Sequence, residues 1–114
     1  MISPARIWHD PGHGGVNEGC VYAGVLERVL VVDIGTDIVG GLHQWAGTTH
    51  RLARESDISL EYSDRAQAAW DWGAGLALLH HANAMYDRTT GEVMPDFDGL
   101  MCFALAQDRI GLEV

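Results

Sequence analysis

Two histidines and one glutamate in this 114-residue chain have the side-chain types of a catalytic metal site. His13 follows an Asp-Pro-Gly breaker, His81 follows a short apolar run, and Glu27 lies near the start of a long helical pattern. Two imidazoles and one carboxylate are a common ligand set for catalytic zinc, with a fourth position left for water. The three residues are far apart in the chain, so their spacing alone does not define a site. Taken singly, each is typical of a surface histidine or a helix-start carboxylate.

The composition limits the partners that we expect. Hydrophobic residues make up 47% and charged residues 20%, which is typical of a globular protein and excludes collagen-like or strongly disordered classes. Lys and Arg number 7 against 16 Asp and Glu, and the net charge of −9 argues against nucleic acid and membrane surfaces as partners. The N-terminus lacks a signal-peptide pattern, and no apolar run reaches the ~20 residues of a membrane span. We therefore expect synthesis in the cytoplasm; the oligomeric state stays open.

Strand-like runs alternate with helical periodicity along the chain, which predicts one α/β domain over residues 1–114. We expect strands at 5–9, 48–52, 76–79 and 99–104, helices at 25–45 and 59–72, and loops at 11–24 and 82–98. Right-handed crossovers then give a mainly parallel twisted sheet with helices on both faces. Working residues of such sheets lie at the carboxyl ends of the strands, where His13 and His81 are expected.

The same patterns predict which side chains pack inside the domain. The helix at 25–45 is expected to bury a face that includes Val29 and Val32, and Ser59 is expected to cap the second helix. The run 76–79 is typical of a buried strand. The tryptophans are expected to pack rather than to stack on sugars: Trp8, Trp45, Trp70 and Trp72.

Several short blocks follow one another along nearly the whole chain. They are Asp-Pro-Gly-His-Gly-Gly at 10–15, Asn-Glu-Gly at 17–19, Gly-Val-Leu-Glu-Arg at 24–28, Arg-Glu-Ser-Asp at 54–57, Ser-Leu-Glu with Arg65 at 59–66, and His-Ala-Asn-Ala at 81–84. In order and spacing this series resembles the zinc-dependent N-acetylmuramoyl-L-alanine amidases, the type 3 peptidoglycan amidases. The resemblance covers roughly residues 5–105.

The resemblance implies a set of metal ligands. It implies Zn²⁺ held by His13, Glu27 and His81. We choose His81 over His80 because His81 is the histidine followed by Ala-Asn-Ala. His80 replaces an apolar residue of the family, and neighbouring residues of a strand point to opposite faces.

Further residues are implied around the metal. Asp10 would tie down the glycine-rich loop or orient a ligand, Asn17 would form a hydrogen bond where the family usually has Asp, and Asn83 would support the ligands or shape the loop. The alternative for these three is turn chemistry alone. The family's late glutamate, which handles protons, follows a further helix and strand. Against that pattern the chain is short at its C-terminus, and Glu113 is the remaining candidate for the role.

The resemblance implies a hydrolase that cleaves the amide bond between N-acetylmuramic acid and L-alanine in peptidoglycan. Action at the cell wall after endolysin-like release fits the missing signal-peptide pattern. Two alternatives stay open. The first is an incomplete or non-catalytic amidase-like zinc domain that binds the cell wall without turnover. The second is a zinc hydrolase with the same fold that acts on another amide.

Overall fold

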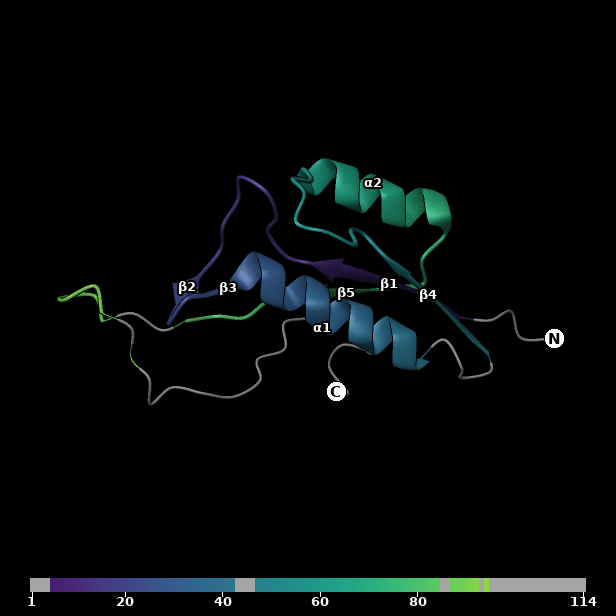
Figure 1. The fold of residues 1–114 in the computed structure, drawn as a ribbon. Coiled ribbons are helices and arrows are strands. Elements are labelled where there is room, and N and C mark those ends of the chain that lie inside the picture. Colours follow the sequence, from purple (N-terminus) through teal and green to yellow (C-terminus); the bar gives the residue numbers. More distant parts are fainter. Residues whose placement is uncertain (1–4, 43–46, 85–86, 93, 95–114) are drawn as a thin grey trace. The chain divides into compact units, whose positions relative to one another are not determined.

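The structure is a computed structural model that describes residues 5–42, 47–84, 87–92 and 94. The chain divides into two compact units, Met1–Ala84 and Met85–Val114, and each is described by itself. The helices and strands that the structure describes all lie in the first unit (Figure 1). In the second unit, the described residues form a turn in which the Asp87 carboxylate accepts hydrogen bonds from the backbone N–H groups of Thr89 and Thr90.

A parallel sheet lies at the centre of the first unit. Its strands are β1 (Ala5–Pro11), β4 (Thr48–Leu52) and β5 (Leu76–His80), in the order β4-β1-β5. Pro11 at the end of β1 pairs with His80 at the end of β5, so the carboxyl ends of these strands lie together. The predicted mainly parallel sheet is confirmed. The strand predicted at 99–104 lies outside the described residues.

The helices α1 (Glu27–Leu42) and α2 (Tyr62–Trp72) cover opposite faces of the sheet, as predicted (Figure 1). Alternation along β1 divides its side chains between them. Trp8 and Asp10 line a cleft beside α2, whereas Pro11 approaches α1 at Gly35. A Cβ at Gly35 would lie 3.2 Å from the Pro11 ring, so this glycine allows the helix to pack closely on the sheet.

The first helix begins two residues later than predicted. Val21–Tyr22 (β2) and Val25–Leu26 (β3) form a small antiparallel hairpin instead. Its two-residue turn has positive φ at both Ala23 (49°) and Gly24 (78°), which is the geometry that joins tightly paired antiparallel strands. The hairpin therefore delivers Glu27 as the first residue of α1.

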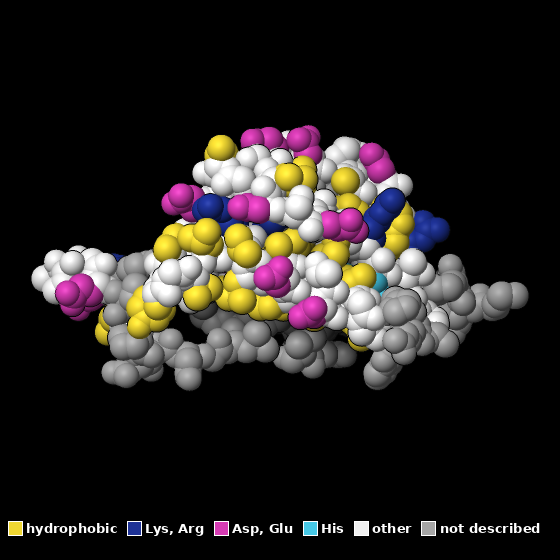
Figure 2. Space-filling model, in the orientation of Figure 1, with side chains coloured by type: hydrophobic (Ala, Val, Ile, Leu, Met, Phe, Trp, Pro, Cys, Tyr) yellow, Lys and Arg dark blue, Asp and Glu magenta, His cyan; other side chains and the backbone are white. Residues whose placement is uncertain are grey.

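The buried face of α1 matches the prediction at Val32 but not at Val29. Val31 and Val32 are buried together with Gly35, whereas Val29 is exposed. Figure 2 shows apolar side chains on the outer surface over this helix. Because α1 is apolar around most of its circumference, periodicity does not select one face, and the close approach at Gly35 decides which side meets the sheet. None of the described helices is long and apolar enough to cross a membrane.

The second helix starts at Tyr62 rather than at residue 59, and its N-cap residue, Glu61, makes no side-chain capping bond. Ser59 is not a cap: its hydroxyl accepts a hydrogen bond from the N–H of Val16, at 3.0 Å. Ser59 therefore ties the glycine-rich loop to the segment before α2, a long-range contact that local capping patterns do not reveal.

The tryptophans divide into packed and exposed ones. Trp8 is buried and contacts Trp72, with ring centroids 6.0 Å apart, so packing is confirmed for both. Trp70 is 81% exposed, and the packing role predicted for it is wrong. The face of α2 that meets the cleft carries Arg65, Ala66 and Ala69, and Trp70 points away from it. Trp45 lies outside the described residues.

Strand β5 is not buried as predicted. Leu78 is exposed, and 65% of Leu79 is accessible to solvent. The strand lies at the edge of the described sheet, where only β1 pairs with it. Among the described strands this apolar run therefore lies at an edge, and composition alone does not distinguish an edge strand from a central one.

Candidate metal centre

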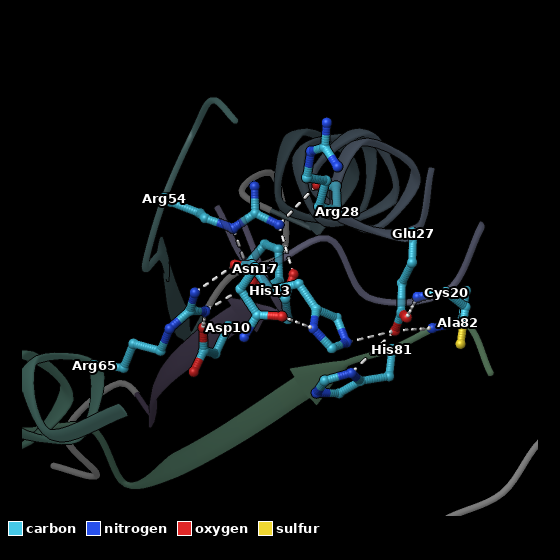
Figure 3. Close-up of polar contacts among 12 residues, drawn as sticks. Asp10, His13, Asn17, Cys20, Glu27, Arg28, Arg54, Arg65, His81 and Ala82 are labelled. Carbon is cyan, nitrogen blue, oxygen red and sulfur yellow. Dashed lines mark hydrogen bonds and ion pairs between the residues drawn. The ribbon is translucent and has the colours of Figure 1, made fainter. Parts of the chain in front are cut away.

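The predicted ligands converge at the carboxyl ends of β1 and β5 (Figure 3). His13 follows β1, His81 follows β5, and Glu27 opens α1. One potential ligand atom from each lies within 4.8 Å of the other two. Glu27 Oε1 is 3.2 Å from His13 Nε2 and 3.1 Å from His81 Nδ1. Three segments far apart in sequence thus present two imidazoles to one carboxylate oxygen.

The carboxylate of Glu27 is buried but held in its charged form. Its side chain is 2% exposed. Burial opposes ionisation, but backbone N–H groups of Cys20 (2.7 Å to Oε2) and Ala82 (3.0 Å to Oε1), together with the two imidazoles, outweigh burial and lower the pKa of Glu27. A buried anion fixed by two backbone donors is a rigid ligand for a cation.

Asn17 determines which nitrogen of His13 is free. The Nδ1–H of His13 donates to Asn17 Oδ1 at 2.8 Å, because an amide oxygen can only accept. The lone pair of Nε2 then faces the Glu27 carboxylate at 3.2 Å. Two electron-rich atoms this close require a cation between them, either a proton on the imidazole or a metal ion. Two nitrogens and one oxygen are a ligand set that suits a divalent transition-metal ion.

The site is buried on the side of Glu27 and accessible to solvent on the side of His81. The Glu27 side chain is buried, whereas 38% of the His81 side chain is accessible to solvent. Water and a substrate can therefore approach from the imidazole side.

Two glycines lie where the backbone runs next to the side chains of the site, and neither position has room for a Cβ. A Cβ at Gly12 would lie 2.3 Å from Cε1 of His81. Gly19 has φ of +69°, and its Cβ would lie 2.6 Å from both His13 and Glu27. A larger residue at either position would collide with the side chains of the site.

The supporting residues named from the sequence have different surroundings. Asp10 is buried and forms an ion pair with Arg65, away from the imidazoles (Figure 3). Asn83 is exposed, and within the described part of the chain its side chain forms no hydrogen bond. Glu113 lies outside the described residues.

Sequence reasoning missed two buried arginines behind the site. Arg54 and Arg65 donate hydrogen bonds to backbone carbonyls of the segment that leads to His13 (Figure 3). Both arginines lie within the blocks that carry the family resemblance, and this was the available signal.

A second group of histidines, also missed, lies between the sheet and α1. His9 Nδ1 is 3.0 Å from His80 Nε2, and His9 Nε2 is 2.9 Å from His50 Nδ1. Burial lowers the pKa of His9 to about 4, with further contributions from its two neighbours. The neighbouring residues His80 and His81 belong to different groups, because His80 contacts His9 while His81 contacts Glu27.

Comparison with known families gives a match over most of the chain. The profile of the N-acetylmuramoyl-L-alanine amidase family matches residues 7–100. The chain is 35% identical over 80 residues to the sporulation-specific N-acetylmuramoyl-L-alanine amidase of Bacillus subtilis, covering 69% of this chain and 31% of that protein. It is 33% identical over 78 residues to the endolysin of Bacillus phage SPP1, covering 68% of this chain and 29% of that protein.

Solved structures give the same likeness. The N-acetylmuramoyl-L-alanine amidase AmiC2 of Nostoc punctiforme superimposes with a TM-score of 0.68 at 30% identity, over 75% of this chain and 48% of that one. The catalytic domain of CwlV from Bacillus (Paenibacillus) polymyxa var. colistinus has the same fold, with a TM-score of 0.67 at 24% identity, over 71% of this chain and 46% of that domain. The chain thus spans about a third of these curated relatives and just under half of these solved structures.

Proposed function

The chain belongs to the N-acetylmuramoyl-L-alanine amidase family, and from this membership we propose that it hydrolyses the amide bond between N-acetylmuramic acid and L-alanine in peptidoglycan, using Zn²⁺. The observation that carries the proposal is the convergence of His13, Glu27 and His81 inside the matched region. Peptidoglycan is then the partner, and the cell wall is the place of action. Relatives that include an endolysin support this setting.

The ligand atoms follow from the contacts. His13 through Nε2, His81 through Nδ1 and Glu27 through Oε1 would hold Zn²⁺. When bound, zinc supplies a Lewis acid that activates water at neutral pH and polarises the amide carbonyl. Glu27 keeps its second oxygen on the Cys20 N–H, which fixes the plane of the carboxylate.

The neighbouring residues prepare these ligands. Asn17 keeps the proton of His13 on Nδ1, which leaves Nε2 available. Asp10 does not contact the ligands directly; it forms an ion pair with Arg65, which in turn binds the carbonyl of His13. Asn83 follows the ligand His81 and would shape the loop after it. The leaving nitrogen also needs a proton, and Glu113 stays our candidate for handling it.

Muropeptide analysis tests the proposal. The zinc-loaded chain would be incubated with purified peptidoglycan, with and without a chelator, and the products identified by mass spectrometry. Chelator-sensitive separation of stem peptides from glycan is expected, and His81→Ala should abolish it. His80→Leu is the matched control, because this neighbouring histidine contacts His9 and not Glu27.

The alternative predicts a different result. If zinc binds but no stem peptide is released, while the chain still sediments with peptidoglycan, the domain binds the cell wall without turnover. Release of stem peptides that the chelator does not prevent would contradict the zinc assignment.

A further inference from the structure

The backbone segment that carries His13 is held from behind by two buried guanidinium groups (Figure 3). Arg54 donates to the carbonyl oxygens of Pro11 (3.0 Å) and Gly12 (2.6 Å). Arg65 donates to Pro11 O at 2.8 Å and to the carbonyl oxygen of His13. The carbonyls point toward the arginines, while the imidazole of His13 points to Glu27 on the other side.

His13 has an unusual backbone conformation. Its φ is 59°, and among the described non-glycine residues only Ala23 shares a positive value. Residues with a Cβ avoid this left-handed region unless their surroundings hold them there. In this conformation the carbonyl of His13 accepts from Arg65 while its ring contacts the Glu27 carboxylate.

Arg65 is itself fixed by two further groups. Its guanidinium pairs with the Asp10 carboxylate at the end of β1, and its Nε donates to Leu60 O at 3.2 Å. It also lies on the face of α2 that meets the sheet. Arg65 therefore connects a strand, a helix and the carbonyl of a residue that faces the site. Only a planar fork of donors can span these acceptors together.

Arg54 offers an internal comparison. It is equally buried and holds the same segment, but its hydrogen bonds reach Pro11, Gly12, Arg28 and Ser56 and do not include His13. Loss of Arg54 removes support from the segment in general. Loss of Arg65 removes the contact to His13 in particular.

We propose that Arg65 is a positioning residue that holds His13 in its left-handed conformation and so sets the metal site before the ion binds. The inference rests on the proposed zinc site at His13, Glu27 and His81. The proposal also explains why the positively charged Arg65 is buried next to a site for a metal cation. Arg65 binds the backbone carbonyl of His13, whereas the ring of His13 faces the metal site.

The experiment compares zinc affinity with stability in the same set of variants. Zn²⁺ affinity would be measured by competition with a chelating dye, and unfolding of the metal-free chain by urea. Arg65→Lys keeps the charge but loses the fork, and we expect roughly 10- to 100-fold weaker zinc binding, as for other groups that orient ligands. Arg54→Lys, the matched control, should reduce stability with a smaller loss of zinc affinity.

A second readout does not depend on affinity. In the metal-free wild-type chain, imidazole ¹⁵N NMR should show one ordered Nδ1–H signal for His13, bonded to Asn17, and in Arg65→Lys this signal should broaden or disappear. The wild-type spectrum also tests the contact directly, because a held Arg65 gives separate, slowly exchanging Nη–H signals. Freely rotating Arg65 signals would overturn the inference even if no variant folds.

The outcomes separate the two proposals. If the wild-type chain does not bind Zn²⁺, the proposed function fails, whatever the variants do. If the wild-type chain binds Zn²⁺ and Arg65→Lys binds it equally well, only the role of Arg65 fails. Equal losses of affinity in Arg65→Lys and Arg54→Lys would also overturn it, because the effect would then be general loosening.

Discussion

The histidines in the described part of the chain form two groups, and the groups differ in what surrounds them. His13 and His81 share a buried carboxylate and are open to solvent on one side. His9, His50 and His80 contact one another in a row beneath α1, with His50 also bonded to Thr48. The open group has a carboxylate at its centre, whereas the hydrogen bonds of the buried group join imidazoles to one another and to the Thr48 hydroxyl.

This difference decides what the imidazoles can do. In the open group, one nitrogen of each ring faces the same carboxylate oxygen, an arrangement that suits a bound cation. In the buried row, each contact between rings pairs an N–H of one ring with a lone pair of the other, and burial lowers the pKa of His9 and His80, which favours their neutral forms. The same residue type is therefore a candidate ligand beside Glu27 and a neutral packing group beside α1.

Removing the charge of Glu27 should have the largest effect on zinc affinity, because His13 and His81 would then no longer share a carboxylate. Glu27→Gln keeps the shape of the side chain but leaves an amide among two backbone donors and two imidazoles. We expect zinc affinity to fall by more than roughly 100-fold, beyond the loss for an orienting residue. Isothermal titration with Zn²⁺ measures it, with the exposed Glu18→Gln as control. Unchanged affinity would remove Glu27 from the ligand set.

The second-largest effect is expected from acid, which should lower the stability of the fold by protonating His9 in the buried row. The pKa of His9 is about 4 in the folded chain, below the 6.5 of a free histidine. The unfolded chain therefore binds more protons between these values, so stability falls as the pH falls from 6.5 to 4, and His9 contributes no further loss below that range. At about 1.4 kcal/mol per pH unit, the loss from His9 reaches at most about 3 kcal/mol.

Urea unfolding at a series of pH values, with a chelator present, checks this expectation without a contribution from bound metal. In His9→Leu the part of the slope between pH 6.5 and 4 that comes from His9 should disappear. An identical slope in both chains would show that the row does not need to be neutral.

Changing the acceptor of His13 should have the smallest effect. In Asn17→Asp a carboxylate replaces the amide oxygen that accepts from Nδ1–H. This should make Nε2 more basic and strengthen zinc binding several-fold, at most about tenfold. Asn17→Ala should weaken binding instead. Dye competition measures both, and effects in the same direction would show that Asn17 does not act through the His13 ring.

The sequence allowed prediction of the parts that follow from chain direction. His13 and His81 were expected at one edge because parallel strands that alternate with helices end on the same side, and they lie there. The hairpin at Val21–Leu26 was missed. Its turn is Ala-Gly rather than the usual Asn-Gly or Asp-Gly, and helical periodicity continued through Val25 and Leu26.

The remaining features depend on strand register and on long-range contacts. His50 and His80 become neighbours of His9 only because Ile7 pairs with His50 and Pro11 with His80. Nothing local shows that Arg54 and Arg65 are buried, since the carbonyls that accept their hydrogen bonds are brought together only when the segment at Pro11 to His13 turns. Patterns along the chain give element types, whereas these contacts need the folded sheet.

The hairpin before α1 has a consequence for tolerance to insertion. Its base is closed twice: the Glu27 N–H donates to Cys20 O at 2.9 Å, and the Cys20 N–H donates to the Glu27 carboxylate. Its tip at Gly24 is open, with no atom within 4 Å of a Cβ built there. Extra residues at the tip would therefore extend into solvent, while the closed base keeps the carboxylate in place.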